Sequence, residues 1–448
     1  MARTKNRTAA DRSIATSPPY ESVFASLLRR GSFWLFAVAL VYACEFLWTF
    51  SYRVSQIDFS HYYVSAVAMR AGIDPYTTDL TPIATSFGLD LEEMKAATYP
   101  PTFVLCFEPL TLLPPVPAYW AWTAMNVAFL AIALYLLLDG LPPDNDLRLA
   151  LAGLAILYAP VTDNFFFAQT QILILLLLVL FMRWMKSGQY ALAGLALAFA
   201  ALIKVFPAIV LGYLLLRRQV KAIAYTGAFL VIGGVATFAL VGVERSSHFL
   251  RAFPFLTSPY FFDQLVNVSL AAIVSHLIWT ISGDARLEPV RQMAIVAADL
   301  ALLALTVRAT LRTSKRSNDG DEAVFGLWVV TTVLLSPTAW MHYLVLFLLP
   351  YAVLMRLHLR GAASPVVGWL ALVSYAIAEL QMAAYIGFGQ LADWTHRMPA
   401  WVPLPSMFTW HLSLLLAYAG FYLLAVQTMP VRAAVPRAIG ANRSLRPA

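Results

Sequence analysis

Apolar runs of roughly 20 residues recur along the chain and are separated by short polar segments. Each run is long enough to cross a bilayer as an α-helix, and none shows the period-two alternation of strands in a membrane barrel. The pattern therefore predicts an all-α, polytopic integral membrane protein with about twelve transmembrane helices. The clearest spans are expected near 32–52, 118–138, 323–339, 343–356, 365–388 and 406–428.

Composition supports the membrane class. The chain has 448 residues, of which 60% are hydrophobic and 12% charged, and its mean hydropathy is +0.70. Soluble domains usually carry about twice that charged fraction. The two cysteines, Cys44 and Cys106, do not indicate a disulfide framework, because Cys44 lies inside the first expected span. No nucleotide-binding signature is present, which argues against an ATP-driven pump, and nothing indicates a nucleic-acid partner.

The distribution of charge predicts the orientation. Arg29 and Arg30 precede the first span, so the positive-inside rule places the N-terminus in the cytoplasm. The polar segment 1–30 is expected to be disordered, and the first span is expected to act as a signal anchor. The basic tail 431–448 is expected on an anionic cytoplasmic leaflet. Both termini are therefore predicted to be cytoplasmic, around one transmembrane domain at 31–430.

On this topology, two long segments, 53–117 and 244–266, lie on the outer side and are expected to form the active site. Within the first, proline pairs flank an apolar insert at 99–115 that is too short to span with its flanks. It is predicted to be a re-entrant or interfacial helical element, either a structural lid or a groove for a lipid chain. The run 268–281 is ambiguous. If it spans, the basic segment 308–319 lies outside; if it is re-entrant, that segment lies inside, as the positive-inside rule prefers.

Asp58 is the first candidate for chemistry, because it follows an apolar span directly. An interfacial aspartate often caps the next helix. An ionisable residue beside an apolar span is equally a functional candidate, here a general base. If a helix begins at Asp58, His61 and Tyr62 line the same pocket.

Four further polar positions lie at expected outer ends of spans. Gln169 and Gln171 either bind sugar hydroxyls or cap a helix. Lys204 ends an apolar helix on the face that the positive-inside rule disfavours for lysine, which favours an anionic partner such as a lipid phosphate over simple snorkelling. His342 lies between two spans and is either a packing residue or a partner for a phosphate. Trp340, beside it, is either a belt aromatic or a substrate contact.

Metal signals are weak. Asp144 and Asp146 form a D-x-D pattern in a predicted cytoplasmic loop and are interpreted as solvated. Asp90, with Glu92 and Glu93, is the better candidate, although acidic loop residues are mostly solvated too. No metal-binding motif is present, so neither a metal nor a cofactor is expected.

Several stretches resemble one family when their order and spacing are taken together. They are "DFSHYYVSAVAMRAGIDPY", "YPPTFVLCFEPLTLLP", "QTQILILLLLVL", "ALAGLALAFAALIKVFPAIVLGYLLLRR", "NVSL" and "SPTAWMHYLVLFLLP". The chain is similar to the bacterial polyprenyl-phosphate-sugar-dependent glycosyltransferases of the GT-C class. That family includes actinobacterial α-1,2-mannosyltransferases, which extend phosphatidylinositol mannosides, and related arabinofuranosyltransferases.

The resemblance implies a GT-C fold and an inverting transfer at the outer face of the bacterial plasma membrane. Sugar, with mannose expected, would move from a polyprenyl-phosphate donor to a hydroxyl of a glycolipid or lipid-linked glycan. Asp58 would be the general base, and Lys204 and His342 would bind the donor phosphate. Gln169 keeps the family's Gly-Gln-x-Asn pattern, whereas Ala168 and Gln171 depart from it. The enzyme is expected to be a monomer among membrane lipids.

Two alternatives remain. One is a polyprenyl-phosphate arabinofuranosyltransferase. The other, from a different class, is a secondary transporter or lipid flippase, for which the intramembrane Glu45, Asp299 and Glu379 are the best candidates. Transporters often show inverted repeats and midplane sites. No internal repeat is evident, and the polar candidates gather at one membrane face, which favours the enzyme.

Overall fold

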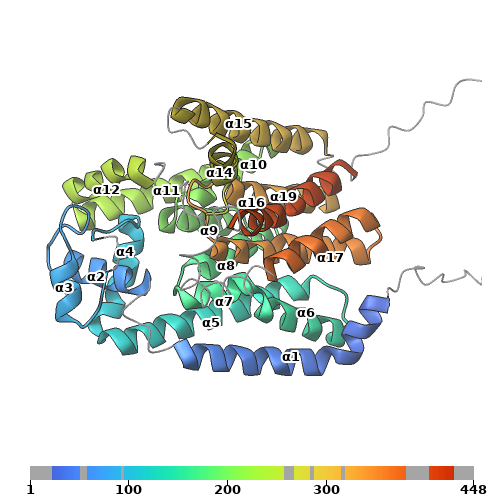
Figure 1. Cartoon of the computed structure of the whole chain (residues 1–448), viewed down its shortest axis with the longest axis horizontal. Coiled ribbons are helices and arrows are strands. Elements are labelled where there is room, and N and C mark those ends of the chain that lie inside the picture. The colour runs from blue at the N-terminus through green and yellow to red at the C-terminus, as the bar shows by residue number, and fades with distance from the viewer. Residues whose placement is uncertain are drawn as a thin grey trace, which may run out of the picture.

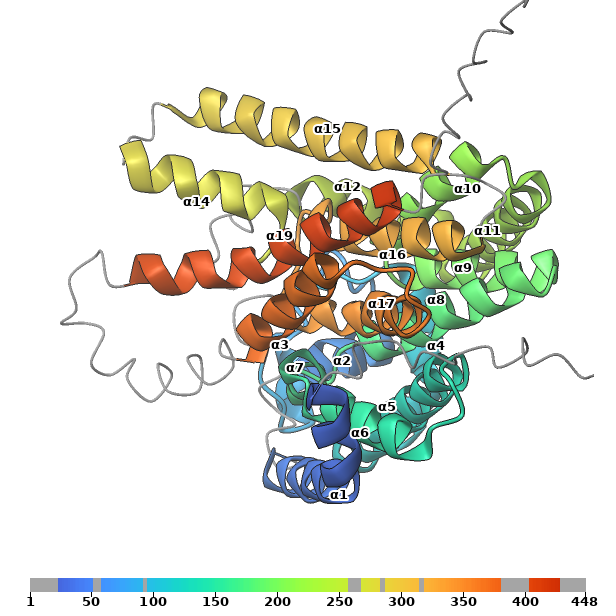
Figure 2. The same ribbon diagram turned by 90° about the vertical axis from the view of Figure 1, so that its right-hand side faces the viewer.

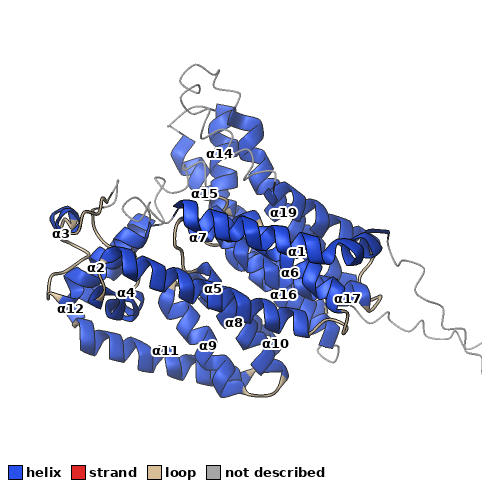
Figure 3. Ribbon diagram, turned by 90° about the horizontal axis from the view of Figure 1, so that it is seen from below, coloured by secondary structure: helices blue, strands red, loops and turns tan. Residues whose placement is uncertain are grey.

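The computed structural model describes residues 23–50, 58–91, 95–256, 267–282, 287–313, 318–379 and 403–427. Over these ranges the chain is helical and contains no strand, which confirms the predicted all-α class (Figure 3). The elements are α1 (Val23–Phe50), α2 (Asp58–Arg70), α3 (Thr81–Ser86), α4 (Pro101–Phe107), η2 (Glu108–Leu112), α5 (Pro115–Asp139), α6 (Asn145–Leu157), α7 (Ala159–Phe166), α8 (Gln171–Lys186), α9 (Tyr190–Ile203), η3 (Phe206–Val210), α10 (Leu211–Arg217), α11 (Val220–Val241), α12 (Val243–Leu256), α14 (Leu270–Ser282), α15 (Glu288–Arg312), α16 (Asn318–Leu334), η5 (Met341–Phe347), α17 (Leu348–Leu359) and α19 (Pro403–Gln427).

Five helical segments in the described ranges are long and apolar enough to cross a membrane. They are Leu28–Thr49, Pro115–Asp139, Val220–Val241, Glu288–Arg312 and Met341–Leu359. A sixth results if α6 and α7, which meet at 48°, are one broken span. The described ranges thus have the apolar helices of a multi-pass protein, and they do not confirm the predicted twelve spans. Runs such as α8, with 16 residues, form helices about 24 Å long, short of the roughly 30 Å hydrocarbon core.

The predicted helical element at 99–115 is present as α4 followed by η2. Prolines set its borders: Pro101 is the first residue of α4 and Pro115 the first residue of α5, where a missing N–H costs nothing. α2, α3, α4 and α12 lie together at one end of the molecule (Figure 1). This end is tied across the sequence, because His248 on α12 pairs with Asp74 and the Arg245 guanidinium donates to the Gly72 carbonyl.

The ambiguous run at 268–281 forms α14, which has 13 residues. At 1.5 Å per residue it is about 20 Å long, too short to cross a bilayer alone. It packs beside α15 (Figure 2). The basic segment 308–319 is less of a loop than expected, since α15 continues to Arg312 and α16 begins at Asn318. A continuous helix of 25 residues explains the difference, because Arg308 and Arg312 follow the apolar run without a helix breaker.

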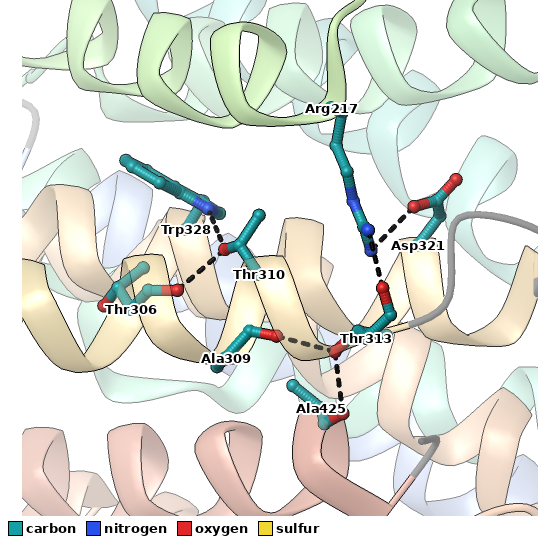
Figure 4. Close-up of polar contacts among 8 residues, drawn as sticks. All are labelled: Arg217, Thr306, Ala309, Thr310, Thr313, Asp321, Trp328 and Ala425. Atoms are coloured by element: carbon teal, nitrogen blue, oxygen red, sulfur yellow. Dashed lines mark hydrogen bonds and ion pairs between the residues drawn. The ribbon is translucent and has the colours of Figure 1, made fainter. Parts of the chain in front are cut away.

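A polar network joins the ends of four helices (Figure 4). The buried Arg217 guanidinium at the end of α10 donates to the Thr313 carbonyl at 2.9 Å and pairs with Asp321 of α16 at 2.8 Å. The Thr313 hydroxyl donates to the Ala425 carbonyl of α19 at 2.8 Å. The Thr313 carbonyl at the end of α15 and the Ala425 carbonyl near the end of α19 thereby gain partners that their own helices do not supply.

The D-x-D segment agrees only in part with its interpretation as solvated, because Asp146 is exposed whereas Asp144 is half-buried. Asp144 caps α6 by accepting a bond from the Leu147 amide at 3.0 Å, and it pairs with Arg29 of α1 at 2.7 Å. Asp146 accepts a bond from the Ser32 hydroxyl at 3.5 Å. The helix start and the neighbouring arginine both bind the Asp144 carboxylate, which therefore fixes α6 to α1.

The polar N-terminal segment also ends earlier than predicted, since α1 begins at Val23 and so covers the last part of 1–30. Residues 1–22 and the basic tail 431–448 lie outside the described residues.

Candidate active site

Asp58 is the first residue of α2, and its carboxylate meets two segments that are distant in sequence. Oδ2 accepts a hydrogen bond from Nε2 of Gln169, and Oδ1 accepts one from the Tyr99 hydroxyl at 3.3 Å. Burial raises the pKa of the Tyr99 phenol, helped by the nearby charge of Asp58. Tyr99 therefore stays protonated and acts as a donor over the ordinary pH range.

Gln169 links Asp58 to Lys204. The Lys204 ammonium donates to Oε1 of Gln169 at 3.0 Å and is only 9% exposed. It also lies 4.7 Å from the centre of the Tyr343 ring, within the range of a cation–π contact. A lysine can only donate and a carboxylate can only accept, so these partners fix the orientation of the amide. Lys204, Gln169 and Asp58 form one hydrogen-bonded chain.

The turn that presents Gln169 is held tightly. Ala168 has a φ of 53°, in the left-handed region where residues other than glycine cost about 1–2 kcal/mol. Its carbonyl accepts a bond from the Trp122 indole at 2.7 Å, and the Gln169 amide donates to the Asn164 carbonyl at 2.8 Å. The left-handed φ gives a physical reason for glycine at this position in the pattern that the chain resembles.

His342 lies in η5 and is 3% exposed. Its Nδ1 is 3.1 Å from Oδ2 of Asp163 on α7, which is 4% exposed. The ring also lies against Phe167 and Tyr343. Since Tyr343 contacts Lys204 as well, the histidine is one aromatic residue away from the Lys204–Gln169–Asp58 chain.

The segment before η5 is held by Asn267, in the "NVSL" stretch. The Asn267 amide donates to the Pro337 carbonyl at 2.9 Å, and its Oδ1 accepts from the Ala339 amide at 3.3 Å. The Val268 amide donates to the Ala339 carbonyl at 2.6 Å. Two of the stretches that carry the resemblance thus touch each other, and their contact positions Trp340 and His342. Trp340 itself is half-buried at the start of η5.

The remaining predicted residues differ in how close they lie to the hydrogen-bonded series Lys204–Gln169–Asp58. His61 is half-buried one helical turn after Asp58, and burial lowers its pKa, against a smaller opposing effect of the Asp58 charge. Tyr62 is buried, with its ring edge-on to Tyr99 at 4.5 Å. Gln171 is fully buried at the start of α8, and its side-chain amide has no hydrogen-bond partner among the described residues. The structure therefore brings Tyr62, but not Gln171, next to the residues that hold Asp58.

Three residues of this cluster were not among the predicted site residues: Tyr99, Tyr343 and Asp163. Asp163 had a signal, because it is a carboxylate inside an otherwise apolar stretch. Tyr99 and Tyr343 had none that separates them from other aromatics at a membrane interface.

The cluster combines two carboxylates with two groups that can donate as cations. Asp58 can take a proton, while Lys204 and His342 can stabilise negative charge. In the described part of the chain, no group of three or more His, Cys, Asp or Glu side chains is arranged to hold a metal ion. In the acidic segment that was the better candidate for a metal site, Asp90 is exposed, and Glu92 and Glu93 lie outside the described residues.

Curated relatives come from mycobacteria. An α-(1→3)-arabinofuranosyltransferase of Mycobacterium tuberculosis is 28% identical over 53% of this chain, and the match spans 54% of that relative, about half its length. A polyprenol-phosphate-mannose-dependent α-(1-2)-phosphatidylinositol pentamannoside mannosyltransferase of Mycolicibacterium smegmatis is 27% identical over 68% of this chain and 73% of its own length. A phosphatidylinositol mannoside mannosyltransferase of the same organism is 28% identical over 63% and 66%.

No solved structure matches the chain. The family model of glycosyltransferase family 87 matches residues 97–337, more than half of the chain. This region contains Tyr99, Gln169, Lys204 and Asn267, while Asp58 lies well before its start and His342 shortly after its end. With the match over more than half its length, the chain belongs to glycosyltransferase family 87.

Proposed function

We propose that the protein transfers a sugar from a polyprenyl-phosphate donor to a hydroxyl of a glycolipid or lipid-linked glycan, with inversion, at the outer face of the bacterial plasma membrane. Mannose is the proposed sugar, because two of the mannosyltransferase relatives are polyprenol-phosphate-mannose-dependent by name. The observation that carries the proposal is the chain of hydrogen bonds from Lys204 through Gln169 to Asp58. It sets a base and a cation next to each other without pairing them directly.

The proposed chemistry assigns each end of this chain a task. The acceptor oxygen attacks the anomeric carbon, and its proton passes to the Asp58 carboxylate. The bond from the anomeric carbon to the phosphate oxygen breaks, and its electron pair leaves with the polyprenyl phosphate. Gln169 and Tyr99 hold the carboxylate in place through Oδ2 and Oδ1, which pre-orients the base before the acceptor binds.

The leaving phosphate gains negative charge as the bond breaks. Lys204 and His342 are proposed to bind it, since fixed cationic donors stabilise developing charge best where water is excluded. Both residues are buried. The lysine has donors left after its bond to Gln169, because an ammonium carries three.

The test is sugar transfer from polyprenyl-phosphate mannose to a glycolipid acceptor by purified protein. General acid–base groups contribute about 10²- to 10⁴-fold to rate, so we expect Asp58→Asn to lower kcat by about that much. Asp90→Asn is the matched control, because Asp90 is an exposed carboxylate on the same outer segment. Near-normal transfer by Asp58→Asn would reject the base assignment.

A second candidate activity is arabinofuranosyl transfer, which the arabinofuranosyltransferase relative favours. The same assay distinguishes the two. Wild-type protein is given polyprenyl-phosphate mannose and polyprenyl-phosphate arabinofuranose separately, and the donor with the higher kcat/KM identifies the sugar.

A further inference from the structure

Asp163 is a buried carboxylate that the proposed transfer does not use. It lies on α7, and only 4% of its surface is exposed. An isolated ionised carboxylate loses several kcal/mol of solvation when it leaves water, so it needs a partner. Its partner is the imidazole of His342, whose Nδ1 is 3.1 Å from Oδ2. The two residues are separated by 179 positions in the sequence.

The other ring nitrogen of His342 has no such partner. Nε2 is buried and makes no hydrogen bond to any described part of the chain. A buried polar atom without a partner is costly, and its lack of a partner calls for an explanation. The contact with Asp163 therefore leaves one side of the ring satisfied and the other open.

The carboxylate determines the form of the ring. An ionised aspartate can only accept, so Nδ1 must carry the proton in this contact. Of the two neutral tautomers, only the Nδ1–H form fits, and the negative charge of Asp163 also favours the doubly protonated ring. Nε2 is then the nitrogen that can meet a ligand, and in the protonated ring it is a donor.

Asp163 and His342 are each held in place by the short element that carries them. α7 begins after a 48° bend from α6, and its first amide, of Ala159, donates to Glu379 at 3.1 Å. This bend lets α7 pack against η5 rather than continue the line of α6. On the other side, Asn267 holds the backbone just before η5. The contact therefore joins two short elements that are each anchored elsewhere.

We propose that Asp163 is a positioning residue that holds a proton on Nδ1 of His342 and stabilises the doubly protonated ring, in which Nε2 donates to the donor phosphate. The proposal rests on the proposed function for its ligand, a polyprenyl phosphate. The charged groups that act on the imidazole are Asp163, Lys204 and Asp58. Of these, Asp163 is in direct contact with the ring.

The kinetic experiment is a double-mutant cycle with Asp163→Asn, His342→Gln and the double variant. We expect Asp163→Asn to lower kcat by about tenfold or more. The double variant should be no slower than His342→Gln, because both changes disrupt the same Asp163–His342 contact.

The pH dependence of the rate is a further readout. The high-pH limb of the rate profile of Asp163→Asn should move to lower pH, because the protonated ring loses its anionic partner. Asp299→Asn, a carboxylate change in the apolar α15, is the control and should leave the profile unchanged.

A second measurement does not depend on activity. Nitrogen-15 spectra of histidine-labelled protein distinguish the Nδ1–H from the Nε2–H form, and the His342→Gln spectrum assigns the signal among the seven histidines. We expect Nδ1 of His342 to be protonated in the wild type and the tautomer to become mixed in Asp163→Asn. An unchanged spectrum, or additive losses in the cycle, would overturn the proposal. Failure of wild-type protein to use any polyprenyl-phosphate sugar would instead overturn the proposed function, and the spectra would still stand.

Discussion

At the scale of the residue, Tyr99 shows how a side chain with no sequence signal can control a predicted one. Its hydroxyl donates to Asp58, and its ring edge packs against Tyr62. Tyr99→Phe keeps the ring and removes the donor, so that among the described side chains Gln169 alone still donates to the Asp58 carboxylate. A hydrogen bond to a charged group is worth about 1.5–3 kcal/mol, and we expect kcat for sugar transfer to fall by about tenfold or more. Tyr135→Phe, on the exposed surface of α5, is the control; equal rates for both variants would show that the Tyr99 hydroxyl has no part.

The candidate site also shows what single residues disclose before the fold is known. Asp58 and Lys204 could be selected because each breaks an apolar pattern at the end of an expected span. The link between them could not be predicted, since Gln169 lies 111 positions from Asp58 and 35 from Lys204. In the sequence, Gln169 also looks like any glutamine that caps a helix. Asp163 was visible as a carboxylate in an apolar stretch, but its importance depends on a contact with a residue 179 positions away.

At the scale of the element, the contact between the Asn267 stretch and the backbone before η5 makes a separate prediction. Asn267 is fully buried and bonds to both Pro337 and Ala339. Asn267→Ala leaves these backbone groups without partners, and each unsatisfied buried group costs about 1–3 kcal/mol. We expect a lower thermal midpoint in detergent and a loss of transfer activity. Asn145→Ala, which is exposed on α6, should change neither; a normal midpoint for Asn267→Ala would show that the contact is dispensable.

Elements were predictable where local chemistry decides them and unpredictable where tertiary packing does. The proline pairs mark the starts of α4 and α5 in the sequence, and both helices begin there. The apolar run at 118–138 became the full-length α5. The bend between α6 and α7 lies at Pro160, a residue type that breaks helices, although no bend was predicted there. α14 is short because its apolar run is short, but the run alone did not decide whether it spans the membrane. Hydropathy shows that a run is buried from water, but it does not show whether lipid or protein covers it.

At the scale of the whole molecule, one group of ion pairs lies at the opposite end of the helices from the candidate site. α8 begins next to Gln169 and ends at Lys186, which pairs with Glu322 at 2.5 Å. α16 begins with the acidic residues of this ion-pair end and leads, at its other end, towards His342. The pairs at this end include Arg183–Asp139, Lys186–Glu322, Arg217–Asp321, Arg356–Glu322 and Arg360–Asp319.

This arrangement bears on the orientation of the α15–α16 connection. Arg217 contacts both the end of α15 and the start of α16, and it is followed by Arg218 and Lys221 at the junction of α10 and α11. The connection is therefore at the ion-pair end, whichever way the molecule faces. The positive-inside rule predicts that this end is cytoplasmic, and the short α14 allows this without a further crossing.

Cysteine labelling of intact cells tests this orientation. In a background with Cys44→Ser and Cys106→Ser, which removes both native thiols, we introduce Ser86→Cys or Arg312→Cys, both at exposed positions at opposite ends. A membrane-impermeant maleimide should label Ser86→Cys from outside, and Arg312→Cys only after permeabilisation. The cysteine-free parent gives the background. Labelling of Arg312→Cys in intact cells would place the ion-pair end outside, and with it the candidate site at the face where no outer-leaflet donor could reach it.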